Sequence, residues 1–151
     1  MPKTKTTVKK TAKPAAKKKI AAPKKVSVKK TSKKITTEDL DDIGLAKLCA
    51  SLVKDKKASN VKVLDLRKLT APCSFFVLCC GESSPQLRAI ASHLEKELKA
   101  QHQIKPYAYD GNVSSYWLAL DYGSVIVHIM DPEKYDYYKL DKLWADAAPV
   151  K

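Results

Sequence analysis

Hydrophobic residues recur at three- and four-residue intervals in three segments of the chain, which is the spacing of an amphipathic helix. The first segment follows Thr37, because a threonine before Glu38 and Asp39 is typical of a helix N-cap. The second segment follows Ser84, a cap residue succeeded by proline at the first helical position. The pattern predicts helices over residues 38–56, 85–101 and 131–144.

Five other segments are rich in β-branched, aliphatic or aromatic residues and are short enough to be strands. The predicted strands cover residues 61–66, 74–80, 104–109, 116–120 and 125–130. Residues 74–80 are apolar throughout, as expected of a strand that is buried on both faces. Residues 110–112 end the third strand, and residues 121–124 form a tight reversal between the last two. The order of elements predicts one α/β domain with a mixed five-stranded sheet flanked by helices.

The charge is distributed unevenly along the chain. Residues 1–37 contain 14 lysines and no arginine or acidic residue, whereas residues 38–151 contain 15 basic and 16 acidic residues. A segment of high net charge and low hydrophobicity cannot offset its conformational entropy by burial. We therefore expect a disordered basic arm over 1–37 and one folded domain over 38–151, which is long enough to bury its own core.

Lysine is suited to phosphate backbones, because its ammonium group is a point charge with little capacity for bidentate base readout. We expect the arm to bind nucleic acid without sequence specificity and with steep salt dependence. The alternative is a solubilising tail with no fixed partner. The arm lysines expected to contact nucleic acid are Lys9, Lys10, Lys17, Lys18, Lys19, Lys24, Lys25, Lys29, Lys30, Lys33 and Lys34.

Composition argues against several classes of protein. No apolar run reaches the roughly 20 residues that cross a bilayer. The first residues lack the apolar core of a secretory signal, and they are poor in the arginine and serine of an organelle transit peptide. A cytoplasmic protein is therefore expected, with its four cysteines as free thiols. Their spacing, with three distant histidines, does not fit a zinc site, so no metal is predicted.

Sequence motifs of catalysis are mostly missing. The chain has only four glycines and contains neither the P-loop nor the dinucleotide-binding pattern. Residues 81–83, Gly-Glu-Ser, could hold a phosphate as in nucleotidyltransferases, but that chemistry needs closely paired carboxylates for two metal ions. Asp65 and Asp121 stand alone on separate predicted strands. A turn with a helix cap is the better interpretation, and we predict no catalytic residue and no cofactor.

Two aromatic residues in the last predicted strands are candidates for a binding face. His128 lies in an apolar strand, where a core or interface histidine is commoner than a catalytic base. Trp117 lies near Tyr116 and Tyr122, which suits a hydrophobic core and a binding surface equally well. The tyrosines between 135 and 138 are more typical of helix packing than of a platform for nucleic-acid bases.

Several motifs of residues 44–146 together resemble the Iojap family, which includes the bacterial ribosomal silencing factor RsfS. The most specific are W-x-x-x-D-x-G-x-V-x-V-H over 117–128 and Y-x-L-x-x-L-W over 138–144. Weaker matches are Lys57-Ala58, Val63-Leu-Asp-Leu66, Ser74-Phe-Phe-Val-Leu-Cys-Cys-Gly81 and Ser83-Ser84. The basic arm lies outside the resemblance.

The resemblance implies a non-catalytic domain with a nucleotidyltransferase-like fold that lacks the active carboxylates. Members of the family bind ribosomal protein L fourteen on the intersubunit face of the large ribosomal subunit and block joining of the small subunit, which represses translation. Organelle relatives act in large-subunit assembly, and isolated members can be homodimers. The partner-binding residues implied here are Trp117, Asp121, His128, Tyr138 and Leu140. In this interpretation the basic arm contacts ribosomal RNA.

Three positions depart from the family pattern. Ser74 stands where an aspartate is common, Ser124 replaces the usual acid after Gly123, and Tyr135 replaces an arginine. Because the family's partner surface is basic, the two lost acids are expected to alter electrostatic contacts at the interface. Two other functions remain open: a nucleic-acid-compacting protein in which the arm does the binding, and a residual nucleotidyltransferase.

Overall fold

The structure is a computed structural model that describes residues 40–151. The predicted disordered arm and the predicted cap at Thr37 lie outside the described residues. The elements in chain order are α1 (Asp42–Asp55), β1 (Ser59–Asp65), β2 (Phe75–Cys80), α2 (Ser84–His102), β3 (Ala108–Asn112), the 3₁₀ helix η1 (Val113–Ser115), β4 (Trp117–Asp121), β5 (Val125–Met130), α3 (Pro132–Tyr138), α4 (Leu140–Leu143) and β6 (Ala148–Pro149).

The strands form one six-stranded sheet in the order β3-β4-β5-β2-β1-β6. β2 and β5 pair in parallel and every other neighbouring pair is antiparallel, which confirms the predicted mixed sheet. The predicted number of five strands is wrong, because β6 adds a sixth. β6 has only two residues, which pair with Leu64 and Asp65. A segment this short shows no alternation of hydrophobic and polar residues, so its sequence carries no strand signal.

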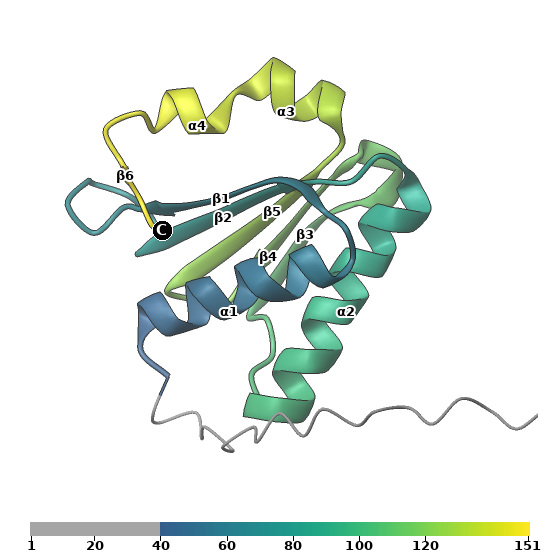
Figure 1. The fold of residues 1–151 in the computed structure, drawn as a ribbon, viewed down its shortest axis with the longest axis horizontal. Helices are drawn as coiled ribbons and strands as arrows, with labels where there is room; N and C mark the ends of the chain where they lie inside the picture. The colour runs from purple at the N-terminus through teal and green to yellow at the C-terminus, as the bar shows by residue number, and fades with distance from the viewer. Residues whose placement is uncertain (1–39) are drawn as a thin grey trace, which may run out of the picture. The chain divides into compact units, whose positions relative to one another are not determined.

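Helices cover both faces of the sheet. α1 and α2 lie on one face, whereas the C-terminal α3 and α4 lie on the other (Figure 1). The first face carries a large aliphatic core between the sheet and α1 and α2. The second face carries a smaller core, in which Phe76, Tyr135 and Trp144 take part. β2 is buried along its whole length, as its continuous apolar sequence predicts.

The predicted start of the first helix at residue 38 is wrong, because α1 begins at Asp42, and the cap of the second helix lies one residue earlier than predicted. The N-cap of α1 is Asp41, whose Oδ1 accepts a hydrogen bond from the Gly44 backbone N–H at 2.9 Å. A carboxylate at this position satisfies a free N–H and suits the helix dipole. The N-cap of α2 is Ser83 and not Ser84, because the Ser83 side chain accepts from Gln86 N–H.

The third strand is shifted by several residues from its predicted position at 104–109. Residues 103 and 104 first cap the C-terminus of α2, and Ile104 N–H donates to the Leu98 carbonyl there. Pro106 then follows, which has no N–H to donate to a sheet ladder. β3 therefore runs through Asp-Gly-Asn, the residues predicted to end it. Gly111 continues the strand at φ 79°, a conformation that glycine adopts readily.

The predicted helix over 131–144 is divided in two. Asp131 caps α3 by accepting from Lys134 N–H at 2.7 Å, as its position before Pro132 suggests. Lys139 then adopts the left-handed region with φ 45°, which ends α3 and redirects the chain into α4. Among the described residues, no helix is long and apolar enough to cross a membrane.

Candidate functional site

The alternation of side chains along β4 separates the hydrophobic core from a second, partly open surface. Leu118 and Leu120 are fully buried toward α1 and α2. Successive residues of a strand point to opposite faces, so Trp117 and Ala119 point toward the side of α3. Ala119 pairs with His128 of β5, which brings that imidazole to the same face as Trp117.

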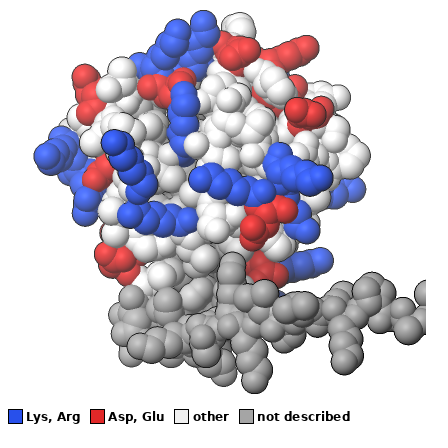
Figure 2. All heavy atoms as spheres, in the orientation of Figure 1, with Lys and Arg blue, Asp and Glu red and all other residues white. Residues whose placement is uncertain are grey.

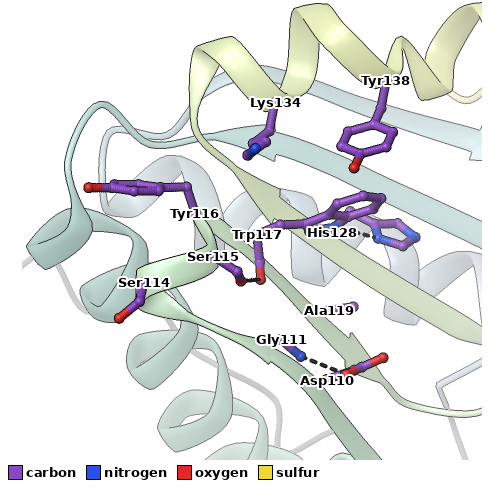
Figure 3. Close-up of a pocket in the computed structure, with 10 residues that line it drawn as sticks. All are labelled: Asp110, Gly111, Ser114, Ser115, Tyr116, Trp117, Ala119, His128, Lys134 and Tyr138. Carbon is purple, nitrogen blue, oxygen red and sulfur yellow. Dashed lines mark hydrogen bonds between the residues drawn. The ribbon is translucent and has the colours of Figure 1, made fainter.

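A groove lies on this face between α3 and the β3–β4 end of the sheet (Figure 3). We call it the aromatic groove; its volume is about 570 Å³. It is lined by Asp110, Gly111, Ser114, Ser115, Tyr116, Trp117, Ala119, His128, Lys134 and Tyr138. These residues come from β3, η1, β4, β5, α3 and the residue between η1 and β4, so the groove exists only in the folded domain.

A hydrogen bond fixes the indole of Trp117 in the groove. Trp117 Nε1–H donates to His128 Nδ1 at 3.2 Å. The bond requires an unprotonated Nδ1, which assigns the ring proton of a neutral imidazole to Nε2. Burial lowers the pKa of His128 to about 4, so the imidazole is uncharged at neutral pH. His128 thus acts as a neutral acceptor that orients the tryptophan.

Trp117 belongs to a continuous series of aromatic rings that runs from the interior to the surface. The ring centroids of Phe76 and His128 are 4.9 Å apart, and those of Trp117 and His128 are 5.8 Å apart. Tyr138 lies over Trp117 with centroids 4.7 Å apart, and Tyr137 follows at 5.0 Å (Figure 3 shows the Trp117–Tyr138 pair). Such pairs contribute about 0.5–1.5 kcal/mol each beyond area burial.

The exposed end of this series is unusual for a protein surface. Tyr137 is 80% exposed and Tyr138 is 45% exposed, although both belong to the same ring stack as the half-buried Trp117. The rings hold one another in place, so little side-chain freedom remains to be lost on binding. The surface is therefore a rigid, amphipathic contact area of the kind that anchors protein–protein interfaces.

The backbone of Trp117 is also held closely by β3 and η1. A Cβ atom on Gly111 would lie 2.2 Å from the Trp117 carbonyl oxygen, so only glycine permits the strands to approach this closely. The Ser115 hydroxyl donates to the same oxygen at 3.0 Å. These contacts explain why the glycine in the middle of β3 does not end the strand.

The structure brings together three of the five residues expected to bind a partner. Trp117, His128 and Tyr138 line the aromatic groove, whereas Asp121 and Leu140 do not. Asp121 lies at the far end of β4, where its Oδ1 accepts from Gly123 N–H at 2.7 Å in the β4–β5 turn. Leu140 is partly buried and packs against the smaller core.

Sequence reasoning missed several residues of the groove. Asp110 and Gly111 were placed after the end of a strand, because Asp-Gly-Asn was interpreted as a break and not as part of β3. Lys134 carries no sequence signal that separates it from other helical lysines. Tyr137, which extends the series of rings beyond the groove, was interpreted as helix packing, yet only Tyr135 of the tyrosine cluster is buried.

The three positions that depart from the family pattern lie outside the aromatic groove. The Ser74 hydroxyl donates to Asp42 Oδ2 at 3.3 Å, and Ser124 accepts backbone bonds from residues 74 and 75. Tyr135 is buried in the smaller core, with Lys62 Nζ 5.8 Å from its ring centroid. The departures therefore affect packing in the smaller core and the backbone contacts where the central strands β2 and β5 begin.

Catalytic chemistry has little support in the described residues. Asp65 and Asp121 lie on β1 and β4, which are separated by two strands and hence by about 14 Å, whereas two catalytic metal ions lie about 4 Å apart. Arg67 binds both oxygens of Asp65 and lowers the pKa of that carboxyl. Within residues 40–151 no cluster of histidine, cysteine and acidic side chains could hold a metal ion. Burial raises the pKa of the Cys49 thiol to about 12, so this thiol is unreactive.

Comparisons with known proteins agree with this arrangement. A ribosomal silencing factor RsfS from Halalkalibacterium halodurans is 36% identical over 107 residues, which cover 71% of this chain and 91% of that protein. A mouse protein named mitochondrial assembly of ribosomal large subunit protein 1 is 30% identical over 99 residues, which cover 64% of this chain and 43% of that protein.

A crystal structure of a protein from Chromobacterium violaceum is also similar. It superimposes with a TM-score of 0.65 at 30% identity, covering 70% of this chain and 87% of that one. The model of the family "RsfS: Ribosomal silencing factor during starvation" matches residues 37–151, which are the described domain and the three residues before it. The chain therefore belongs to the RsfS family of ribosomal silencing factors, which also includes the Iojap proteins.

Proposed function

We propose that this chain is a non-enzymatic repressor of translation that acts in the cytoplasm by docking on the large ribosomal subunit. The aromatic groove contacts ribosomal protein L fourteen at the intersubunit face, and the bound domain prevents the small subunit from joining. The observation that supports this most strongly is the series of rings that ends on exposed Tyr138 and Tyr137 beside an oriented Trp117.

The chemistry of the groove suits a protein partner. Trp117 already uses its indole N–H internally, so it offers the partner an aromatic surface and not a donor. Tyr116 and Tyr138 stand around it with exposed fractions of 44% and 45%. Large rings that are fixed before binding bury apolar area at low entropic cost, which makes Trp117 the expected hot spot of the interface.

Asp121 and Leu140 have indirect parts in the proposal. The hydrogen bond from Gly123 N–H uses only Oδ1 of Asp121. Oδ2 can therefore accept from a basic group of the partner at the edge of the interface. Leu140 is partly buried and packs against the smaller core, so it anchors the start of α4, two residues after Tyr138. Rim charges change association rate more than affinity, so Asp121 is a smaller contributor than Trp117.

The basic arm adds a second, less specific contact with ribosomal RNA. Its 14 lysines would be tethered near RNA once the domain has docked, which raises their effective concentration. Deletion of residues 1–36 is expected to weaken binding and flatten its salt dependence while selectivity for the large subunit remains. An unchanged salt slope would refute this role. Formation of a homodimer by the free chain stays a prediction.

Joining of purified subunits, followed by light scattering, tests the proposal. Large subunits preincubated with the chain should associate with small subunits slowly and incompletely. Large subunits preincubated with the Trp117→Ala variant should associate as they do alone. If the chain binds large subunits without reducing joining, steric repression is wrong.

A second candidate function is assembly of the large subunit, and the printed name of the mouse relative favours it. An assembly factor would bind immature large subunits more tightly than mature ones. Its depletion from cells would cause precursor particles to accumulate during growth. A silencing factor would instead bind mature subunits and leave assembly intact, so the two functions are separated by the particle that is preferred.

A further inference from the structure

A second groove lies at the opposite end of the sheet, between α1 and the β1–β6 edge, and we call it the lysine groove. Its volume is about 390 Å³. It is lined by Lys47, Ala50, Ser51, Lys54, Val61, Lys62, Val63, Leu64, Pro149, Val150 and Lys151. Four of these residues are lysines and none is acidic, although residues 38–151 as a whole carry one more acid than base.

The lysines of the groove differ in how far their charge is already compensated. Lys62 Nζ lies 2.5 Å from Asp141 Oδ2 of α4 and 5.8 Å from the Tyr135 ring of α3, so its ammonium is paired on the face of the sheet opposite to α1. Lys47, Lys54 and Lys151 are exposed and form no salt bridge with any described residue. Three lysine side chains at the wall of a concave surface thus have no salt-bridge partner within the described domain.

The two groove lysines of α1 are also arranged in a line. Lys47, Ser51 and Lys54 are spaced at i, i+4 and i+7 on α1, so they form one stripe about 10 Å long. Val61 and Val150 provide an apolar base beside the stripe. Figure 2 shows basic side chains spread over the viewed face, with acidic side chains among them.

From these observations we infer that the lysine groove binds the phosphate backbone of RNA. A line of flexible ammonium groups matches a linear chain of phosphates, and it needs no base contacts. A lipid surface fits less well, because the groove residues include no exposed large apolar side chain that could enter a bilayer. The contact is independent of the aromatic groove, since the two lie at opposite ends of the sheet.

Binding of the full chain to a uridine 20-mer, measured by fluorescence anisotropy from 50 to 300 mM salt, tests the inference. The double variant Lys47→Gln/Lys54→Gln removes the two groove charges of α1, and Lys96→Gln/Lys99→Gln on α2 makes the same charge change at other exposed positions. The groove variant should weaken binding and reduce the slope of log K against log salt by about 1.4, or about 0.7 for each lost contact. The α2 variant should leave the slope unchanged.

A photo-crosslinker at Ser51, between the two lysines, locates the RNA directly. It should form a crosslink to the 20-mer, whereas a crosslinker at Lys96 should not. Equal losses in both double variants, an unchanged slope in the groove variant, or no crosslink from Ser51 would each overturn the inference. Loss of binding to phosphatidylserine vesicles with RNA binding intact would assign the groove to a lipid and would also overturn it. The assay contains no ribosomes, so its result does not depend on docking through Trp117.

Discussion

The aromatic groove and the lysine groove lie at opposite ends of one sheet and differ in what determines their shape. In the aromatic groove each ring is fixed by its neighbours, and Trp117 is bonded to His128 as well. In the lysine groove the two lysines of α1 are exposed and form no salt bridge with a described residue, so their side chains are held only through the helix backbone. The first is suited to a partner of defined shape, whereas the second is suited to any polyanion. Substitutions should therefore change affinity and selectivity at one end and salt dependence at the other.

The largest expected contrast between the two ends is in their response to pH. Burial lowers the pKa of His128 from 6.5 to about 4. Between these two pH values the imidazole is protonated in the unfolded chain and neutral in the folded chain. His128 therefore contributes stability that is complete above pH 6.5 and is lost as pH falls toward 4, by up to about 3 kcal/mol. This contribution belongs to the aromatic groove, because His128 lines it.

Urea unfolding of the wild type and of His128→Asn at pH 7, 6, 5 and 4 measures this contribution. The asparagine cannot titrate but keeps an acceptor near the position of Nδ1. The difference in unfolding free energy between the two proteins should change steadily between pH 6.5 and 4. Parallel curves would show that His128 is not held neutral by the fold.

Truncation of Trp117 should have the next largest effect. Trp117→Ala is expected to weaken binding to isolated large subunits by about 2 kcal/mol or more, roughly 30-fold, because it removes the central ring of the surface. Tyr109→Ala is the matched control: it removes an aromatic ring of β3 whose partner Leu120 points to the opposite face. A comparable loss in both variants would mean that the aromatic groove is not the site of contact.

A smaller effect should separate docking from stability at His128. His128→Leu removes the acceptor of Trp117 Nε1–H, so binding to large subunits should weaken by about 1 kcal/mol, roughly fivefold. The same change also removes Nε2, a buried polar atom that has no hydrogen-bond partner among the described residues. Its removal offsets the loss of the bond to Trp117, so the unfolding free energy at pH 7 should barely change. Wild-type affinity in His128→Leu would contradict an orienting role for the imidazole.

The sequence predicted more of the fold than of the site. The strand over 125–130 and the buried β2 follow from local hydrophobic patterns, and both were placed within one residue. The shift of β3 could not be predicted, because Gly111 is held by its approach to the Trp117 backbone, a tertiary contact. The two-residue β6 and the turn at Lys139 carry no periodic signal.

Only some of the residues that line the two grooves could be predicted from the sequence. Trp117 and His128 belong to adjacent strands, so their pairing could be guessed from a predicted hairpin. Lys134 and Asp110 reach the groove only through the path of α3 and β3. The lysine groove joins α1 to the last residues of the chain, about 100 positions apart, and only the folded sheet shows that they meet.

The smallest expected effect concerns the ion pair at the rim of the lysine groove. Asp141→Asn removes the partner of Lys62, whose ammonium lowers the pKa of that carboxyl. The pair is exposed to solvent, so stability should fall by no more than about 0.5 kcal/mol. Binding to the uridine 20-mer should barely change, because the Lys62 ammonium lies against α4 and not beside the lysines of α1. A marked change in RNA binding in this variant would place the RNA elsewhere.

Sedimentation through sucrose gradients tests the central claim most directly. The wild type, Trp117→Ala and Lys47→Gln/Lys54→Gln would each be mixed with large subunits, small subunits or joined ribosomes at physiological salt. We predict that the wild type and the lysine variant travel with large subunits and not with joined ribosomes, whereas Trp117→Ala loses that selective binding. If Trp117→Ala still travels selectively with large subunits, recognition does not depend on the aromatic groove and the proposed function is wrong.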